Sequence, residues 1–214
     1  MRASRVVGAI TAAAMIAGTS MSEAASFSYP RMLGVQPDQI SFADPVLAPM
    51  QHVRFCLNYP ADCAVHGVDF RRQHIALTLE RWDELNAVNR AVNHYISPQP
   101  DFSAPALTEW HILPAAGDCA DYAITKRHML LALGWPSRSL LLSEVVVPSG
   151  EHHLVLVVRM KDLDLVLDNL NENIRPLRMT LHQYQWLRIE SPFNPKFWTA
   201  INVPRPVRTA MLVD

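Results

Sequence analysis

A long amphipathic segment occupies residues 69–96, which contain neither glycine nor proline. Its apolar positions recur every three or four residues, the spacing of one face of an α-helix. They are Ile75, Leu77, Leu79, Trp82, Leu85, Val88, Val92 and Tyr95. The pattern predicts a long helix over residues 69–96, ended by the proline-containing segment 97–105.

A second helix is predicted from Asp118 to about Leu133. Asp118 is a favoured N-cap residue, and Asp121, three positions later, completes a pattern that resembles a capping box. Gly134 and Pro136 mark the end of the helix. Its inner face is expected to comprise Ala120, Ala123, Ile124, Met129, Leu130 and Leu133. Cys119 then becomes the first residue inside this helix.

Three apolar runs follow, at residues 139–147, 153–160 and 163–170. All are rich in Val and Leu and are separated by turn-forming residues, which predicts a meander of strands. Residues 181–200 are expected to form a short helix or turn, another strand and a closing loop. Residues 26–67 contain many prolines and are interpreted as an irregular, wrapped segment. The predicted fold class is α+β, with N-terminal helices packed on an antiparallel β-sheet.

The first 25 residues differ in character from the rest. Arg2 and Arg5 precede an apolar stretch and a group of small residues around Ala24, as in a secretory signal peptide. A membrane anchor is the alternative, but the apolar run is short and rich in Ala, Gly, Ser and Thr. We expect residues 1–25 to be a cleaved signal peptide and residues 26–214 to form a single exported domain without stable membrane insertion.

Charge excludes little beyond polyanion binding. Without residues 1–25 the chain has 17 Lys and Arg against 19 Asp and Glu. No basic stripe stands out, so neither a nucleic acid nor a membrane surface is an expected partner.

The three cysteines are informative because an exported protein meets an oxidising compartment. Cys56 and Cys63 are close enough in sequence to form a disulfide, which would leave Cys119 as the odd thiol. Such a thiol is either buried and inert or kept for its reactivity. The N-terminus of a helix lowers the pKa of a cysteine, which favours a nucleophile, although Asp118 and Asp121 oppose the thiolate.

A nucleophilic thiol needs a base, and the base needs an orienting group. His152 and His153 open a predicted strand, whereas the other seven histidines occur singly. If the next two strands form a hairpin with an even-length loop near residues 161–164, His153 and Asp168 share one face. An odd loop or a bulge would reverse this. Asp168 interrupts an apolar run and needs a partner, or it simply caps a turn. The residues alone thus leave open both a Cys119–His153–Asp168 triad and purely structural roles for these side chains.

The segments 117–136, 152–159 and 165–170, read as "GDCADYAITKRHMLLALGWP", "HHLVLVVR" and "LVLDNL", resemble the bacterial transglutaminase-like cysteine proteinase family. The similarity also includes the paired cysteines, "VNRAVN" at 88–93 and "QYQWLRIESPFNP" at 183–195. The resemblance implies a papain/transglutaminase-like core. It also implies that Cys119 is the nucleophile, His153 the general base and acid, and Asp168 the group that orients the imidazole.

The resemblance also raises the question of calcium. In a branch of this family that cleaves surface adhesins in the periplasm, glutamate follows the cysteine and nearby acidic residues bind calcium. Here Ala120 holds that position, while Asp118 and Asp121 remain as candidate calcium ligands. Calcium prefers six to eight oxygen ligands. A weakened site and a purely structural role of both aspartates as helix caps are therefore both open.

These observations predict an exported, periplasmic cysteine endopeptidase that acts through a thioester. Its expected partners are a surface or periplasmic protein substrate and, by analogy with the family, a regulatory receptor of the inner membrane. A transglutaminase-type acyltransferase or amidase is the first alternative, because only the acyl acceptor differs. A non-catalytic binding module is the second.

Overall fold

The computed structural model describes residues 38–67, 75–99 and 109–202. The predicted signal peptide at residues 1–25 lies outside the described residues and stays a prediction. The predicted single domain over residues 26–214 is described only in part, so its bounds also stay a prediction. No helix within the described ranges is long and apolar enough to cross a membrane.

Within the described ranges, seven strands form an antiparallel sheet in the order β1-β9-β8-β4-β5-β6-β7. They are β1 (Ser41–Val46), β4 (Leu140–Val146), β5 (His152–Arg159), β6 (Asp164–Leu167), β7 (Arg175–Pro176), β8 (Gln185–Ser191) and β9 (Asn194–Asn202). A separate parallel pair joins β2 (Ser97–Pro98) to β3 (Ala116–Gly117). The meander β4-β5-β6 was predicted from the sequence and is confirmed.

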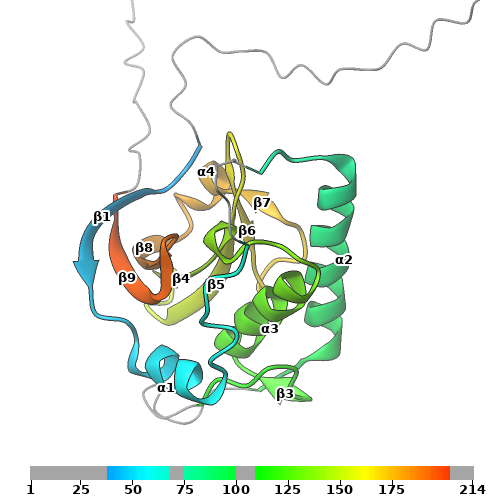
Figure 1. Ribbon diagram of the computed structural model, residues 1–214, viewed down its shortest axis with the longest axis horizontal. Helices are drawn as coiled ribbons and strands as arrows, with labels where there is room; N and C mark the ends of the chain where they lie inside the picture. Colours follow the sequence, from blue (N-terminus) through cyan, green and yellow to red (C-terminus); the bar gives the residue numbers. More distant parts are fainter. Residues whose placement is uncertain (1–37, 68–74, 100–108, 203–214) are drawn as a thin grey trace, which may run out of the picture. The chain divides into compact units, whose positions relative to one another are not determined.

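The helices are α1 (Met50–Asn58), α2 (Leu79–Tyr95), α3 (Cys119–Ala132) and the short α4 (Leu177–Thr180), with a 3₁₀ turn at Ser137–Ser139. Helices α2 and α3 lie beside each other, and α3 packs against β5 (Figure 1). The α+β class, with helices early in the chain packed on an antiparallel sheet, is therefore confirmed.

The central strands β4, β5 and β6 are buried on both faces of the sheet, which explains why they are continuous apolar runs in the sequence. Leu140, Leu142, Leu154, Leu156 and Val158 belong to one core, which they share with α2 and α3. The alternate residues of the same strands belong to a second core on the other face, among them Leu141, Val155, Val157 and Val166. Strand alternation thus divides two adjacent residues of β5 between opposite faces.

Three predictions about the elements were wrong. Helix α2 begins at Leu79 rather than near residue 69, because the Thr78 side chain caps it by accepting a hydrogen bond from the Arg81 N–H. Residues 26–67 are not irregular throughout, since β1 and α1 lie there. The C-terminal segment contains two paired strands, β8 and β9, rather than one strand and a loop. Of these elements, β1 depends on pairing with the distant β9, which local propensity does not reveal. The cap of α2 and the β8–β9 hairpin are local features that the sequence pattern did not resolve.

Candidate active site

Helix α3 presents Cys119 as its first residue, as predicted. The Asp118 carboxylate accepts hydrogen bonds from the N–H groups of Ala120 and Asp121 at 2.9 and 3.3 Å, and Asp121 accepts one from the Asp118 N–H at 3.0 Å. This reciprocal capping box fixes the first turn of the helix. At the other end, Gly134 has a φ of 88° and donates to Leu131, which terminates the helix where the sequence predicted.

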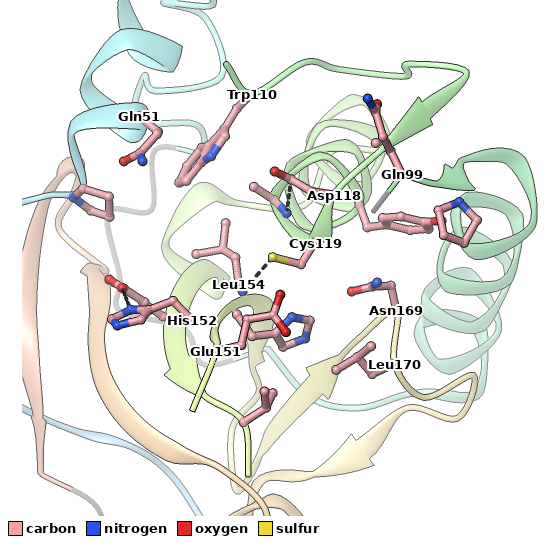
Figure 2. A pocket seen from close by; sticks show the side chains of 18 of the residues that line it. Gln51, Gln99, Trp110, Asp118, Cys119, Glu151, His152, Leu154, Asn169 and Leu170 are labelled. Carbon is pink, nitrogen blue, oxygen red and sulfur yellow. Dashed lines mark hydrogen bonds and ion pairs between the residues drawn. The ribbon is translucent and has the colours of Figure 1, made fainter. Parts of the chain in front are cut away.

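Cys119 opens onto a cavity of about 460 Å³, whose walls also include Trp110, Glu151, His153 and Leu154 (Figure 2). The sulfur accepts a hydrogen bond from the Leu154 N–H at 3.4 Å. Within the described part of the chain, Cys119 and His153 are not hydrogen-bonded to each other. The thiol and the imidazole therefore share one cavity without a direct bond in this structure.

The helix N-terminus was expected to lower the pKa of Cys119, but burial outweighs this effect in the structure. Burial of the sulfur raises the pKa of the Cys119 thiol to about 12, and the charges of Asp118 and Glu151 act in the same direction. The N–H groups of Leu154 and Ala120 lower the pKa but do not outweigh the loss of solvation. The resting thiol is therefore protonated at neutral pH.

His153 and Asp168 form a buried pair, with 2.9 Å between His153 Nε2 and Asp168 Oδ1. The two share one face of the sheet because the register pairs Arg159 with Asp164, so that the β5–β6 loop has an even length. The prediction that His153 and Asp168 share one face, given an even-length loop, is thus confirmed. Since Nε2 donates to Asp168, the Nδ1 atom is the ring nitrogen left to accept a proton.

Asp168 is held by more groups than His153 alone. Its Oδ1 also accepts from the Leu170 N–H at 3.0 Å, and its Oδ2 accepts from the Tyr184 hydroxyl at 2.5 Å and from Arg175 at 3.5 Å. Burial by itself would raise the pKa of Asp168, but the hydrogen bonds from His153, Tyr184 and Leu170 and the charge of His153 lower it to about 2. The carboxylate is therefore ionised throughout the physiological range.

Tyr184 and Arg175 were not identified from the sequence. Burial and the bond to Asp168 raise the pKa of Tyr184 to about 12, which keeps its hydroxyl a donor. The Arg175 guanidinium lies 5.9 Å from the centre of the Tyr184 ring. The one available signal was the position of Tyr184 inside the resembling segment 183–195, and it did not indicate a contact with Asp168.

The adjacent His152 belongs to a different wall of the cavity. Its Nδ1 lies 2.6 Å from Glu144 Oε1, and Glu144 also accepts a hydrogen bond from Arg188. Arg188 in turn donates to the main-chain carbonyl of Leu47 at 2.6 Å. His152 is thus paired with Glu144, whereas His153 is the histidine that pairs with Asp168.

Lys126, like Arg175, is a charged residue near the site that was not identified from the sequence. It lies two turns after Cys119 on α3, is fully buried, and has no hydrogen-bond partner for Nζ among the described residues. Burial lowers the pKa of Lys126 to about 7, while the charge of Asp168 acts in the opposite direction. No pattern in the sequence indicated a role for Lys126.

The residues present fit calcium poorly. Both carboxylate oxygens of Asp121 accept backbone N–H groups, one from His111 and one from Asp118, and one oxygen of Asp118 is engaged in the same way. Ala120 offers no side-chain oxygen between them. Three of the four carboxylate oxygens of this pair already accept backbone N–H groups, whereas calcium prefers six to eight oxygen ligands. Both aspartates act here as helix caps.

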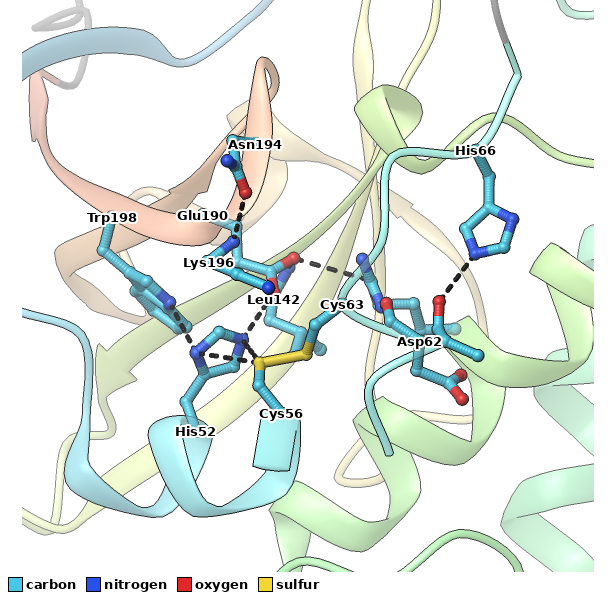
Figure 3. The surroundings of a disulfide bond; sticks show 12 residues. His52, Cys56, Asp62, Cys63, His66, Leu142, Glu190, Asn194, Lys196 and Trp198 are labelled. Atoms are coloured by element: carbon cyan, nitrogen blue, oxygen red, sulfur yellow. Dashed lines mark hydrogen bonds and ion pairs between the residues drawn. A yellow bond between two sulfur atoms is a disulfide. The ribbon is translucent and has the colours of Figure 1, made fainter. Parts of the chain in front are cut away.

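The disulfide between Cys56 and Cys63 is present, as predicted, and leaves Cys119 as a free cysteine. His52 lies 3.6 Å from the Cys56 sulfur and 2.9 Å from Glu190, with both side chains buried (Figure 3). Within the described ranges, His52, Cys56 and Cys63 form the one group of side chains that is close enough to share a metal ion. The disulfide accounts for this proximity, since oxidised cysteines offer no thiolate.

A family model for the bacterial transglutaminase-like cysteine proteinase BTLCP matches residues 42–205 of the chain. Among solved structures, calcium-bound LapG of Legionella pneumophila is 25% identical, with a TM-score of 0.47, and the match covers 56% of this chain and 68% of that one. A second structure of Legionella pneumophila LapG is 23% identical, with a TM-score of 0.46 and coverage of 55% and 66%. An EGTA-treated form is also 23% identical, with a TM-score of 0.45 and coverage of 56% and 67%. No curated protein matches the chain.

Proposed function

The chain belongs to the bacterial transglutaminase-like cysteine proteinase family and is a cysteine peptidase; from this premise we propose that it is an exported endopeptidase whose nucleophile is Cys119, with His153 as base and acid and Asp168 as the orienting group. The observation that carries the assignment of roles is the His153–Asp168 pair at 2.9 Å beside the cavity that Cys119 opens onto. Each residue type suits its role in acyl transfer.

The high pKa of the resting thiol determines how the first step proceeds. Because Cys119 is protonated, Sγ attacks the peptide carbonyl carbon while its proton moves to His153 Nδ1. The C–N bond then breaks as His153 returns the proton to the leaving amine, which leaves a thioester on Cys119. Water, deprotonated by His153, attacks the thioester, and Sγ leaves with the returned proton.

The negative charge that develops on the carbonyl oxygen needs donors. The main-chain N–H of Cys119 is the first N–H of α3 and has no partner within the helix. The next N–H, that of Ala120, already donates to Asp118. Cys119 therefore supplies the oxyanion donor from α3. Lys126 adds a buried positive charge further along the same helix when it is protonated.

Export and partners rest on the sequence pattern and on the family. The signal-peptide pattern of residues 1–25 supports a periplasmic location, and the peptidase family supports a surface or periplasmic protein as substrate. An inner-membrane receptor is a further proposal by analogy with the family. No step of the mechanism uses calcium, because the capping aspartates are already engaged by backbone N–H groups.

The test is to incubate the wild type and Cys119→Ala with periplasmic and surface proteins, and to identify new protein N-termini by mass spectrometry. We expect new termini with the wild type and none with the variant. Equal cleavage by both proteins would disprove the role of Cys119. A labelled primary amine is added in parallel. Its incorporation without new termini would indicate an acyltransferase, and neither product would indicate a binding module.

A further inference from the structure

Two asparagines one turn apart on α2, Asn89 and Asn93, reach the turn that follows β6. The Nδ2 of Asn93 donates to the main-chain carbonyl of Asp168 at 3.0 Å. The Nδ2 of Asn89 donates to the carbonyl of Glu172 at 2.9 Å. Helix α2 thus holds both ends of the segment 168–172, which carries the proposed orienting carboxylate.

The first of these bonds replaces support that the sheet does not provide. The β5–β6 pairing ends at Leu167, and the β6–β7 pairing ends one residue earlier at Val166. Asp168 therefore lies beyond both ladders, at the point where the chain turns away. Its carboxylate is fixed by His153 and Tyr184, but its carbonyl is fixed from α2.

These two hydrogen bonds come with an energetic cost. The Oδ1 atoms of Asn89 and Asn93 are both buried without a hydrogen-bond partner in the described part of the chain. A buried unsatisfied acceptor is unfavourable, and leucine, which has the same number of side-chain heavy atoms, would not carry one. The hydrogen bonds donated by the two amide groups are therefore what distinguishes asparagine from an apolar residue at these positions.

Helix α2 also packs against α3, which carries Cys119 (Figure 1). It thereby connects the helix of the nucleophile to the turn of Asp168. A small displacement of Asp168 would rotate the imidazole of His153 through their shared hydrogen bond, and reacting groups tolerate little misplacement.

We propose that Asn93 is a positioning residue for the reaction, which fixes the main chain of Asp168 and through it the orientation of His153. Asn89 makes an equivalent bond four residues away from Asp168 along the turn and has only a structural role. The inference rests on the proposed roles of Cys119, His153 and Asp168.

The two asparagines provide a matched pair for the test, Asn93→Leu against Asn89→Leu. Each variant loses one hydrogen bond from the same helix to the same turn, so comparable losses of stability to urea are expected. The first readout is the rate at which iodoacetamide alkylates Cys119 at pH 7.5, since Cys56 and Cys63 are joined in a disulfide. The second is the proton NMR signal of the His153 Nε2–H that donates to Asp168.

We expect Asn93→Leu to slow alkylation about tenfold or more and to broaden or remove the Nε2–H signal. Asn89→Leu should stay within about twofold of the wild type and keep the signal. Equal behaviour of the two variants in both readouts would overturn the proposal. If Asn93→Leu does not fold, Asn93→Ala and Asn89→Ala are compared in the same way.

His153→Ala and Asp168→Asn serve as references for the chemistry itself. If they slow alkylation while Asn93→Leu matches Asn89→Leu, only the role of Asn93 is wrong. If both references react as fast as the wild type, the proposed roles of His153 and Asp168 fail and the role of Asn93 fails with them.

Discussion

The hydroxyl of Tyr184 donates a 2.5 Å hydrogen bond to Asp168 Oδ2, while the other oxygen of the same carboxylate accepts from His153. The two bonds approach Asp168 from different elements, because His153 lies on β5 and Tyr184 precedes β8. A carboxylate that is bound on both oxygens cannot rotate away from the imidazole. Tyr184 therefore contributes to the orientation of His153, although it does not line the cavity.

Replacing Tyr184 with phenylalanine should weaken both the fold and the reaction. The change leaves Asp168 Oδ2 with only the longer contact to Arg175, so we expect a loss of about 1–3 kcal/mol in the free energy of unfolding. Alkylation of Cys119 by iodoacetamide at pH 7.5 should slow severalfold. Tyr95, which is 57% exposed, provides the control variant Tyr95→Phe. Similar results for both variants would show that the Tyr184 hydroxyl is unimportant.

Gly117→Ala should disrupt the first turn of α3. A Cβ at this position would lie 2.4 Å from Asp121 Oδ2, which closes the capping box. We expect a loss of about 1–2 kcal/mol in urea unfolding, together with a marked drop in the reactivity of Cys119. Gly134→Ala is the matched control, because its positive φ strains the other end of the same helix. If Gly134→Ala lowers the reactivity of Cys119 as much, the effect is not specific to the cap.

Asp121 should make the stability of the protein depend on pH. Burial raises its pKa to about 6, above the value of about 4 expected for the unfolded chain. The folded state then binds the proton more tightly than the unfolded state, so the contribution of Asp121 to stability falls as the pH rises from 4 to 6. The change should be on the order of 2 kcal/mol, measured by urea unfolding at several pH values. In Asp121→Asn this pH-dependent part should disappear. An unchanged profile would contradict the prediction.

Calcium should have no effect on the site. Because Asp118 and Asp121 are engaged by backbone N–H groups and Ala120 adds no ligand, neither calcium nor EGTA should change the melting temperature or the alkylation rate of Cys119. Both quantities are measured at a calcium concentration of about 1 mM, roughly the dissociation constant of weak extracellular sites, and again after chelation. Ala120→Glu tests the reason for this. If calcium measurably raises the melting temperature of the wild type, the prediction is wrong.

The parts of the molecule that could be predicted from the sequence depend on short-range chemistry. The capping box joins Asp118 to a residue three positions away, and Gly134 ends the same helix through local hydrogen bonds. The pairing of His153 with Asp168 followed from the two-residue period of strands once the hairpin loop had an even length. The disulfide closes a separation of only seven residues.

Other features depend on contacts between distant parts of the chain, and no local pattern indicated them. Asn93 and Asp168 are 75 residues apart, and His52 and Glu190 are 138 apart. Packing across such distances placed β1 on the sheet. The contacts of Arg175 and Tyr184 with Asp168 span only 7 and 16 residues, but they depend on how the chain turns after β6, which no pattern in the sequence indicated. Packing also outweighed the expected lowering of the pKa of Cys119. The sequence showed the helix N-terminus and its aspartates, but how far the sulfur is removed from water depends on the elements folded over it, and that burial is the largest cause of its raised pKa.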